Sequence, residues 1–370
     1  MVVDAGGIGQ RIADARGRAG YTQAQLASAI SLDRSALAKI EAGQRRVSAL
    51  ELARLADALD VRVEWFLQDA PPAIISRRSA QEPGTPSPRI DSLVERITRS
   101  VEFVAEHDDR FAIPTVETQP VPTTNVEADA LAETARALLG MDRDEPCVHL
   151  DQKVAGIGLY AFSFGLGFES ADAATIALDR GGVAVINGEQ RVGRRRLALA
   201  HELCHYLVAD DYTVDWRVAE HQASERREGL FDRFARALLL PESGVRDTWE
   251  SYASDGDRRG AAVRIASEYR VDMATLAYRL HEIGVLGQAD SVKVRSIRTT
   301  RADIVEMNLV VGEELNPPTL PREYVLAVLR LYRTETVSLE RALDLLLDAW
   351  DRDAMPTLPK RGENEIWQFV

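Results

Sequence analysis

The chain has 370 residues, 45% of them hydrophobic, and is therefore long enough for two or three domains with cores of their own. Its formal net charge is −13, so any binding to nucleic acid must rest on a local basic surface and not on overall charge. No stretch approaches about 18 consecutive apolar residues and no apolar run follows the first residues, which predicts neither a membrane span nor a signal peptide. With only two cysteines, Cys147 and Cys204, we expect a cytoplasmic protein.

The first segment, residues 9–67, has apolar residues at helical spacing in several short blocks. Thr22 and either Ser31 or Asp33 are good N-caps at the points where blocks begin. Over nearly its whole length, including the Glu41-x-Gly43 stop, this segment closely resembles the Xre/Cro-type helix-turn-helix. The resemblance implies a five-helix bundle over residues 1–69, in which a helix starting at Thr22 crosses the DNA backbone and the next, 34–41, enters the major groove.

Six polar residues of this segment are the expected contacts to a double-stranded DNA operator. Three project from the second of these helices and could reach base edges: Arg34, Ser35 and Lys39. Three could contact phosphates at its two ends: Gln23, Arg45 and Arg46. A solvated helix face, or a helix-turn-helix that now binds protein, is the alternative. Because the segment is nearly balanced in charge, non-specific affinity should be weak, and we expect a homodimer.

Residues 70–125 are predicted to be a linker with one helix. Residues 70–88 are rich in proline and polar side chains, which suits a mobile tether. A helix from Asp91 to about His107 then carries apolar residues along one side. We expect that side to pack on the following domain, with a spacer or a dimerising helix as the alternatives.

Residues 126–288 are predicted to form a mixed domain of helices and a few strands. Residues 126–140 read as a helix that ends at a glycine, and 157–162 and 182–187 read as short strands that are apolar and bounded by glycine. Residues 194–196, three consecutive arginines, are expected to be the solvated start of the next helix.

The most informative residues of the chain are His201-Glu202-Leu203-Cys204-His205. On a helix, residues i and i+4 lie on one face, so His201 and His205 can bind one Zn²⁺ with Glu202 beside them as general base. The residues before and after the motif are mostly apolar, so these polar side chains should be buried where they need partners. The pattern indicates a metalloprotease, and the alternative is an exposed polar turn.

A hydrolytic zinc site takes three protein ligands, so a third must be found. Residues 225–240 read as a second amphipathic helix, stopped by Pro241. Glu228 is the preferred third ligand, and Glu225, His221 and Asp232 remain alternatives, because carboxylate and imidazole both suit zinc. Asp232 is better explained as a residue that orients a ligand histidine.

Residues 193–207, followed by Glu228 and the run up to Pro241, resemble the ImmA/IrrE family of metallo-endopeptidases. The resemblance implies a zincin-like domain with a small β-sheet, His201 and His205 as ligands, Glu202 as catalytic base and Glu228 as third ligand. Residues 261–284 resemble the helical pair that closes this domain. An edge strand beside such a metal-binding helix commonly binds substrate as an added strand. Oxyanion donors are sought among three residues of the closing helices: Tyr269, Tyr278 and His281.

The last segment, residues 289–370, is predicted to be a C-terminal mixed segment of unknown role. Residues 292–311 alternate apolar and polar residues as strands would, 321–332 and 338–347 read as helices, and the apolar tail 366–370 could dock on a partner or on its own domain. The fold class is therefore α+β and mainly helical.

Two functions are consistent with this organisation. The first is a DNA-binding transcriptional regulator with a zinc-dependent endopeptidase domain, in which Glu202 activates a zinc-bound water to cleave a protein substrate. The family resemblance implies that this substrate is a repressor or other regulator in a stress or mobile-element response. The second is an antitoxin or autorepressor that binds DNA and a cognate toxin or repressor, with the peptidase fold used mainly for binding.

Overall fold

The computed structural model describes residues 5–59, 63, 66, 74–78, 88–167, 172–178, 180–209, 221–254, 256–309 and 312–358. Helices dominate these residues and one small sheet accompanies them, so the predicted α+β, mainly helical class is confirmed. Within the described part of the chain, no helix has the length and apolar character needed to cross a membrane.

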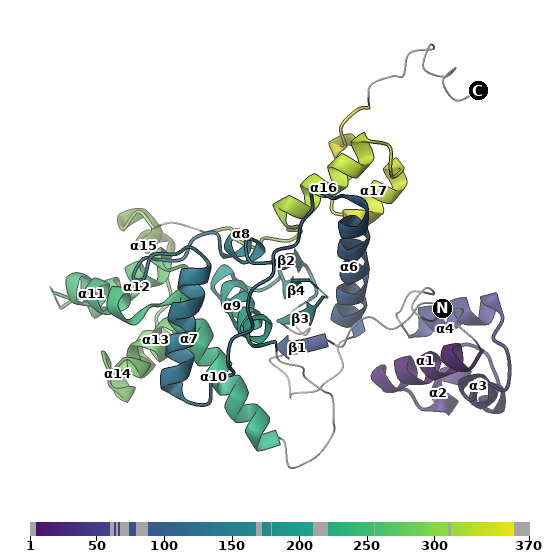
Figure 1. Ribbon diagram of the computed structural model, residues 1–370. Coiled ribbons are helices and arrows are strands. Elements are labelled where there is room, and N and C mark those ends of the chain that lie inside the picture. The colour runs from purple at the N-terminus through teal and green to yellow at the C-terminus, as the bar shows by residue number, and fades with distance from the viewer. Residues whose placement is uncertain are drawn as a thin grey trace, which may run out of the picture.

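The N-terminal helices form a bundle of their own (Figure 1). They are α1 (Ala5–Arg18), α2 (Gln23–Ala29), α3 (Arg34–Glu41) and α4 (Ala49–Ala58). Thr22 caps α2 and Ser48 caps α4, each in a capping box with the residue three positions later. The expected fifth helix lies outside the described residues except for Val63 and for Phe66, whose ring is buried in the bundle core.

A four-stranded sheet forms the centre of the second part of the chain. Its strands are β1 (Ile74–Arg78), β2 (Leu159–Phe164), β3 (Ala173–Ala177) and β4 (Gly182–Asn187). The order across the sheet is β1-β3-β4-β2, with β2 parallel to β4 and with β3 antiparallel to both β4 and β1. The two predicted strands are confirmed as β2 and β4, whereas β3 and β1 were not foreseen.

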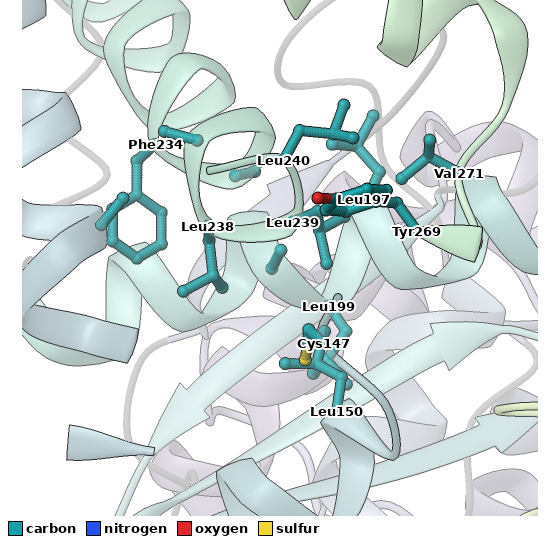
Figure 2. Packing of buried hydrophobic residues seen from close by; sticks show 14 of the residues in the cluster. Cys147, Leu150, Leu197, Leu199, Phe234, Leu238, Leu239, Leu240, Tyr269 and Val271 are labelled. Carbon is teal, nitrogen blue, oxygen red and sulfur yellow. The ribbon is translucent and has the colours of Figure 1, made fainter. Parts of the chain in front are cut away.

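The first face of the sheet is covered by α9 (Val192–Val208) (Figure 1). The strand residues that face α9 include Ala161, Ala173 and Ala184, whose small side chains let the helix approach the sheet closely. Further helices pack in this half of the molecule, among them α7 (Asn125–Leu138), α8 (Leu150–Ala155), α10 (His221–Leu239), α11 (Glu242–Tyr252), α12 (Arg258–Glu268) and α13 (Met273–Glu282). Figure 2 shows part of their shared core, where Leu197 and Leu199 of α9 lie near Leu239 of α10.

The second face of the sheet is covered by α6 (Pro88–His107), which shares a hydrophobic core with α16 (Arg322–Arg333) and α17 (Leu339–Leu345). The apolar side of α6 is fully buried at Ile97, Val101 and Val104, so this helix packs on the sheet as we expected. On the strands, this face carries larger residues than the α9 face. They are Tyr160, Phe162, Ile176, Val183 and Val185.

The prediction of strands over 292–311 is wrong. In the described part of this range the chain forms α14 (Gln288–Ser296) and α15 (Arg301–Glu306). Thr300 and Asp303 make a capping box at the start of α15, and Arg259 holds the Asp303 carboxylate at 2.8 Å. Because these short helices bury very few apolar side chains, their sequence lacks a helical apolar pattern.

The helices predicted over 321–332 and 338–347 are confirmed as α16 and α17. After them comes one short 3-10 turn, η1 (Arg352–Ala354). The apolar tail 366–370 lies outside the described residues.

Candidate metal centre

The motif residues lie in the second half of α9, a helix that is buried on almost all sides. His201 and His205 are 3% and 1% exposed, and Glu202 is fully buried. The helix ends at Ala209, which adopts a left-handed conformation with φ 44°. The predicted placement of these polar side chains inside a core is therefore confirmed, and the exposed polar turn is excluded.

α10 packs beside α9 and turns two carboxylates toward the motif. Glu228 and Asp232 lie one turn apart on α10, and Phe231 between them meets both imidazoles edge-on. The ring centroids of Phe231 and His205 are 4.6 Å apart at an interplanar angle of 89°. The aromatic ring and the two carboxylates thus reach the histidine pair from the same face of α10.

Three donor atoms converge at this point. His201 Nε2 lies 3.2 Å from His205 Nε2 and 3.1 Å from Glu228 Oε2, and His205 Nε2 lies 3.7 Å from the same carboxylate oxygen. Among the described residues these are the one group of three such side chains close enough to share an ion. The preferred third ligand, Glu228, is therefore placed beside both histidines.

The spacing and chemistry of these donors fit Zn²⁺. Tetrahedral zinc with bonds of 2.0–2.2 Å requires its ligand atoms to be about 3.3 Å apart, close to the three distances observed. Asp232 Oδ1 lies 2.9 Å from His201 Nδ1, so this nitrogen donates to the carboxylate and Nε2 of the neutral ring keeps its lone pair. That lone pair faces the oxygen of Glu228, an arrangement that a cation between the two atoms would stabilise.

Glu228 is held in its ionised form. Burial raises the pKa of its carboxyl, but the close contacts with His201 and His205 outweigh burial, so the pKa lies well below its usual range. An ionised carboxylate is the form that binds a metal cation.

The other candidates for third ligand are placed differently. Asp232 contacts Nδ1 of His201, on the side of the ring away from the other two donors, which is the position of a residue that orients a ligand histidine. The side chains of His221 and Glu225 lie outside the described residues.

The three proposed oxyanion donors are all engaged away from the motif. Tyr269 donates to the carbonyl of Asp144, Tyr278 lies between the guanidinium groups of Arg236 and Arg295, and His281 Nδ1 lies 3.2 Å from the carbonyl of Leu286. No described contact brings them to the metal centre.

The arginines at the start of α9 are not a solvated helix start, and that prediction is wrong. Arg194 pairs with Asp172 at 2.6 Å, Arg195 donates to the carbonyl of Gly188, and Arg196 is fully buried. Arg196 binds the carboxylate of Glu314, which also accepts from Arg270. A residue far along the chain thus holds α9, and no local sequence pattern indicated it.

The predicted DNA contacts fall into two groups. Arg34, Ser35 and Lys39 are exposed on α3, as a base-reading helix requires. Of the predicted phosphate contacts, Gln23 donates to Glu41 at 2.8 Å and Arg45 pairs with Glu51 at 2.7 Å. Both side chains would have to share or leave these partners to reach a phosphate.

Comparisons with known proteins match both parts of the chain. Residues 12–66 match the family described as "Helix-turn-helix", and residues 154–281 match a peptidase family, M78, described as "IrrE N-terminal-like domain". A search of curated proteins finds no match. Among solved structures, the chain is similar to the restriction-modification controller protein C.AhdI from Aeromonas hydrophila. The identity is 36% over 17% of this chain and 96% of that one, with a TM-score of 0.17.

Proposed function

We propose that this chain, which carries a helix-turn-helix DNA-binding domain and an IrrE-like domain of a metallopeptidase family, is a transcriptional regulator with zinc-dependent endopeptidase activity. Its substrate would be a regulatory protein such as a repressor. The observation that carries the proposal is the convergence of His201, His205 and Glu228 around one point, with Glu202 buried beside His201. This set supplies three ligands and a base and leaves a fourth position for water.

When bound, Zn²⁺ would polarise the scissile carbonyl and lower the pKa of a water molecule. Glu202 is the base that would accept a proton from that water and later donate it to the leaving amine. Its full burial beside His201 keeps the carboxylate out of bulk water, where a proton would be lost to solvent. Asp232 holds the His201 ring in the orientation that points Nε2 at the centre.

The DNA-binding part of the proposal rests on α3. Arg34 and Lys39 are exposed one turn and a half apart on this helix, and Ser35 follows Arg34 on the same exposed side. We place these three on base edges and Arg46, exposed just beyond the helix, on phosphate. A homodimer would bring two such helices to adjacent half-sites.

Metal content tests the proposal most directly. Elemental analysis of the purified chain should find about one zinc per chain, and both His201→Ala and Glu228→Ala should lose it. Arg226→Ala, an exposed change on the same helix as Glu228, is the matched control and should keep the metal. A folded chain without zinc would contradict the peptidase proposal and favour the alternative, a DNA-binding antitoxin or autorepressor.

A further inference from the structure

Both edges of the sheet are occupied by segments from outside the matched IrrE-like region, 154–281. At the β2 edge, Ser163 and Thr319 exchange two backbone hydrogen bonds of 2.9 Å in an antiparallel bridge. At the other edge, β1 pairs with β3. β1 belongs to the segment between the DNA-binding bundle and α6, so this pairing is made by the linker and not by the domain itself.

The metal-binding helix α9 lies more against β1, at one edge of the sheet, than against β2 at the other. α9 lies against β1 as well as against β3 and β4. Arg194 in the first turn of α9 contacts Asp172, directly before β3, and the ring of Tyr206 lies against Gly182, which pairs with Ala177 at the end of β3. α9 therefore runs along β3, and its motif residues 201–205 lie toward the end of β3 at Ala177.

β1 runs alongside β3, antiparallel to it. Its register places Arg78 opposite Ala173 and Ile74 opposite Ile176, so the Ile74 end of β1 lies toward the motif end of α9. An extended peptide binds an open sheet edge by adding a strand of this kind, because its backbone N–H and C=O groups then find partners. β1 has the backbone pairing that a bound peptide would have.

We propose that residues 74–78 are a built-in occupant of the peptide-binding edge, and that an extended segment of the protein substrate must displace β1 to pair with β3. That the displaced strand makes room for a substrate rests on the proposed peptidase function. That β1 occupies the edge and competes with a free peptide does not depend on that function. The linker thereby couples the DNA-binding bundle to the site, because any partner or movement that draws β1 away opens the edge.

The covalent attachment of β1 to the chain sets how strongly it competes with a free peptide for the sheet edge. Only residues 79–87 separate β1 from α6, and a short tether holds a segment at an effective concentration on the order of 1 mM. A free peptide with an intrinsic dissociation constant of about 100 µM would then bind the unmodified chain roughly tenfold more weakly than a chain without β1.

The test uses a fluorescent peptide with the sequence of residues 72–80 and three full-length chains, all carrying Glu202→Gln so that the probe is not cut. The first chain is otherwise unmodified. In the second, residues 74–78 are replaced by Gly-Ser-Gly-Ser-Gly, and in the third, the control, residues 81–85 are replaced in the same way. We expect anisotropy to show binding to the second chain at least tenfold tighter than to the other two.

Equal binding to all three chains, or binding to none, would overturn the proposal. Should the replaced chain fail to fold, Ser76→Pro with Arg77→Pro gives the same test, because one of two consecutive strand residues directs its N–H to the neighbouring strand. The result does not depend on zinc or on cleavage, so a failure here is distinguishable from a failure of the peptidase proposal.

Discussion

Replacing Glu314 by glutamine should destabilise the domain that holds the metal centre. The Glu314 carboxylate is 5% exposed and accepts hydrogen bonds from Arg196, Arg270 and the backbone N–H of Leu150. Glutamine has the same shape, but it turns an N–H₂ group toward one of the guanidinium groups. At least two charge-assisted bonds are weakened or lost, at about 1.5 kcal/mol each, which gives about 3 kcal/mol. Removing one partner of a buried ion pair typically costs 3–5 kcal/mol, in agreement with this value.

Thermal and urea unfolding of the full chain measure this effect. A loss of about 3 kcal/mol should lower the melting temperature by roughly 6–12 °C. Glu313→Gln is the matched control, because the neighbouring side chain is exposed and should change stability by less than about 0.5 kcal/mol. The reasoning is refuted if the two variants unfold alike. Replacing both partners, with Arg196→Met and Glu314→Leu, should recover part of the loss, because the fully buried guanidinium is removed together with its carboxylate, while the partly exposed Arg270 still loses its partner.

The ion pair of Arg196 with Glu314 also predicts how the free energy of unfolding depends on pH. Burial raises the pKa of Glu314, but the charge of Arg196 and hydrogen bonds from Arg270 and Leu150 lower it below its ordinary value. A carboxyl with a lowered pKa contributes stability above its unfolded pKa of about 4.3, and this contribution is lost as the pH falls through the folded pKa. The difference in unfolding free energy between the unmodified chain and Glu314→Gln should therefore be full above pH about 5 and shrink in acid.

Three further predictions concern the two proposed sites. Asp232→Asn should weaken zinc affinity about 10–100-fold in competition with a chelating indicator, and an unchanged affinity would exclude its positioning role. Glu202→Gln should keep zinc content, melting temperature and DNA affinity while abolishing proteolysis, and loss of zinc in this variant would contradict the role of base. Lys39→Ala should cost about 1–3 kcal/mol of operator binding and relax specificity, whereas Arg46→Ala should weaken binding to all sequences and reduce the salt dependence by about one ion. If Lys39→Ala lowered the affinity for operator DNA and for random DNA by similar factors, Lys39 would contact a phosphate and not a base edge.

The parts of the structure that were predictable from sequence are those that depend on local spacing. Thr22 was predicted as the cap of α2 and caps it, and of Ser31 and Asp33 it is Asp33 that stands at the N-cap position of α3, without a side-chain hydrogen bond. The i, i+4 spacing of His201 and His205 placed both imidazoles on one face. Glu228 was predicted as the third ligand in the same way, from the spacing of an amphipathic helix that ends at a proline. Each of these inferences needs only a few consecutive turns of chain.

The parts that were missed depend on contacts between distant residues. β3 consists of Ala-Ala-Thr-Ile-Ala, which has few of the β-branched and aromatic residues that mark a strand, and it is defined by β4 beside it. β1 lies in a proline-rich stretch that composition assigns to a tether. The pairing of Arg196 with Glu314 joins two residues 118 positions apart, and no motif connects them.

The matched IrrE-like region also depends on segments on either side of it. The sheet face opposite α9 carries Tyr160, Phe162, Ile176, Val183 and Val185, which share a hydrophobic core with α6, α16 and α17. A fragment limited to residues 126–288 would expose these five side chains, at about 1.5–3 kcal/mol each, and would also lack Glu314. The total is comparable to the whole stability of an ordinary domain, 5–15 kcal/mol, so such a fragment should not fold. Residues 322–345 therefore serve the fold of the IrrE-like region itself, and a fragment meant to retain the candidate metal site must keep α6, α16 and α17.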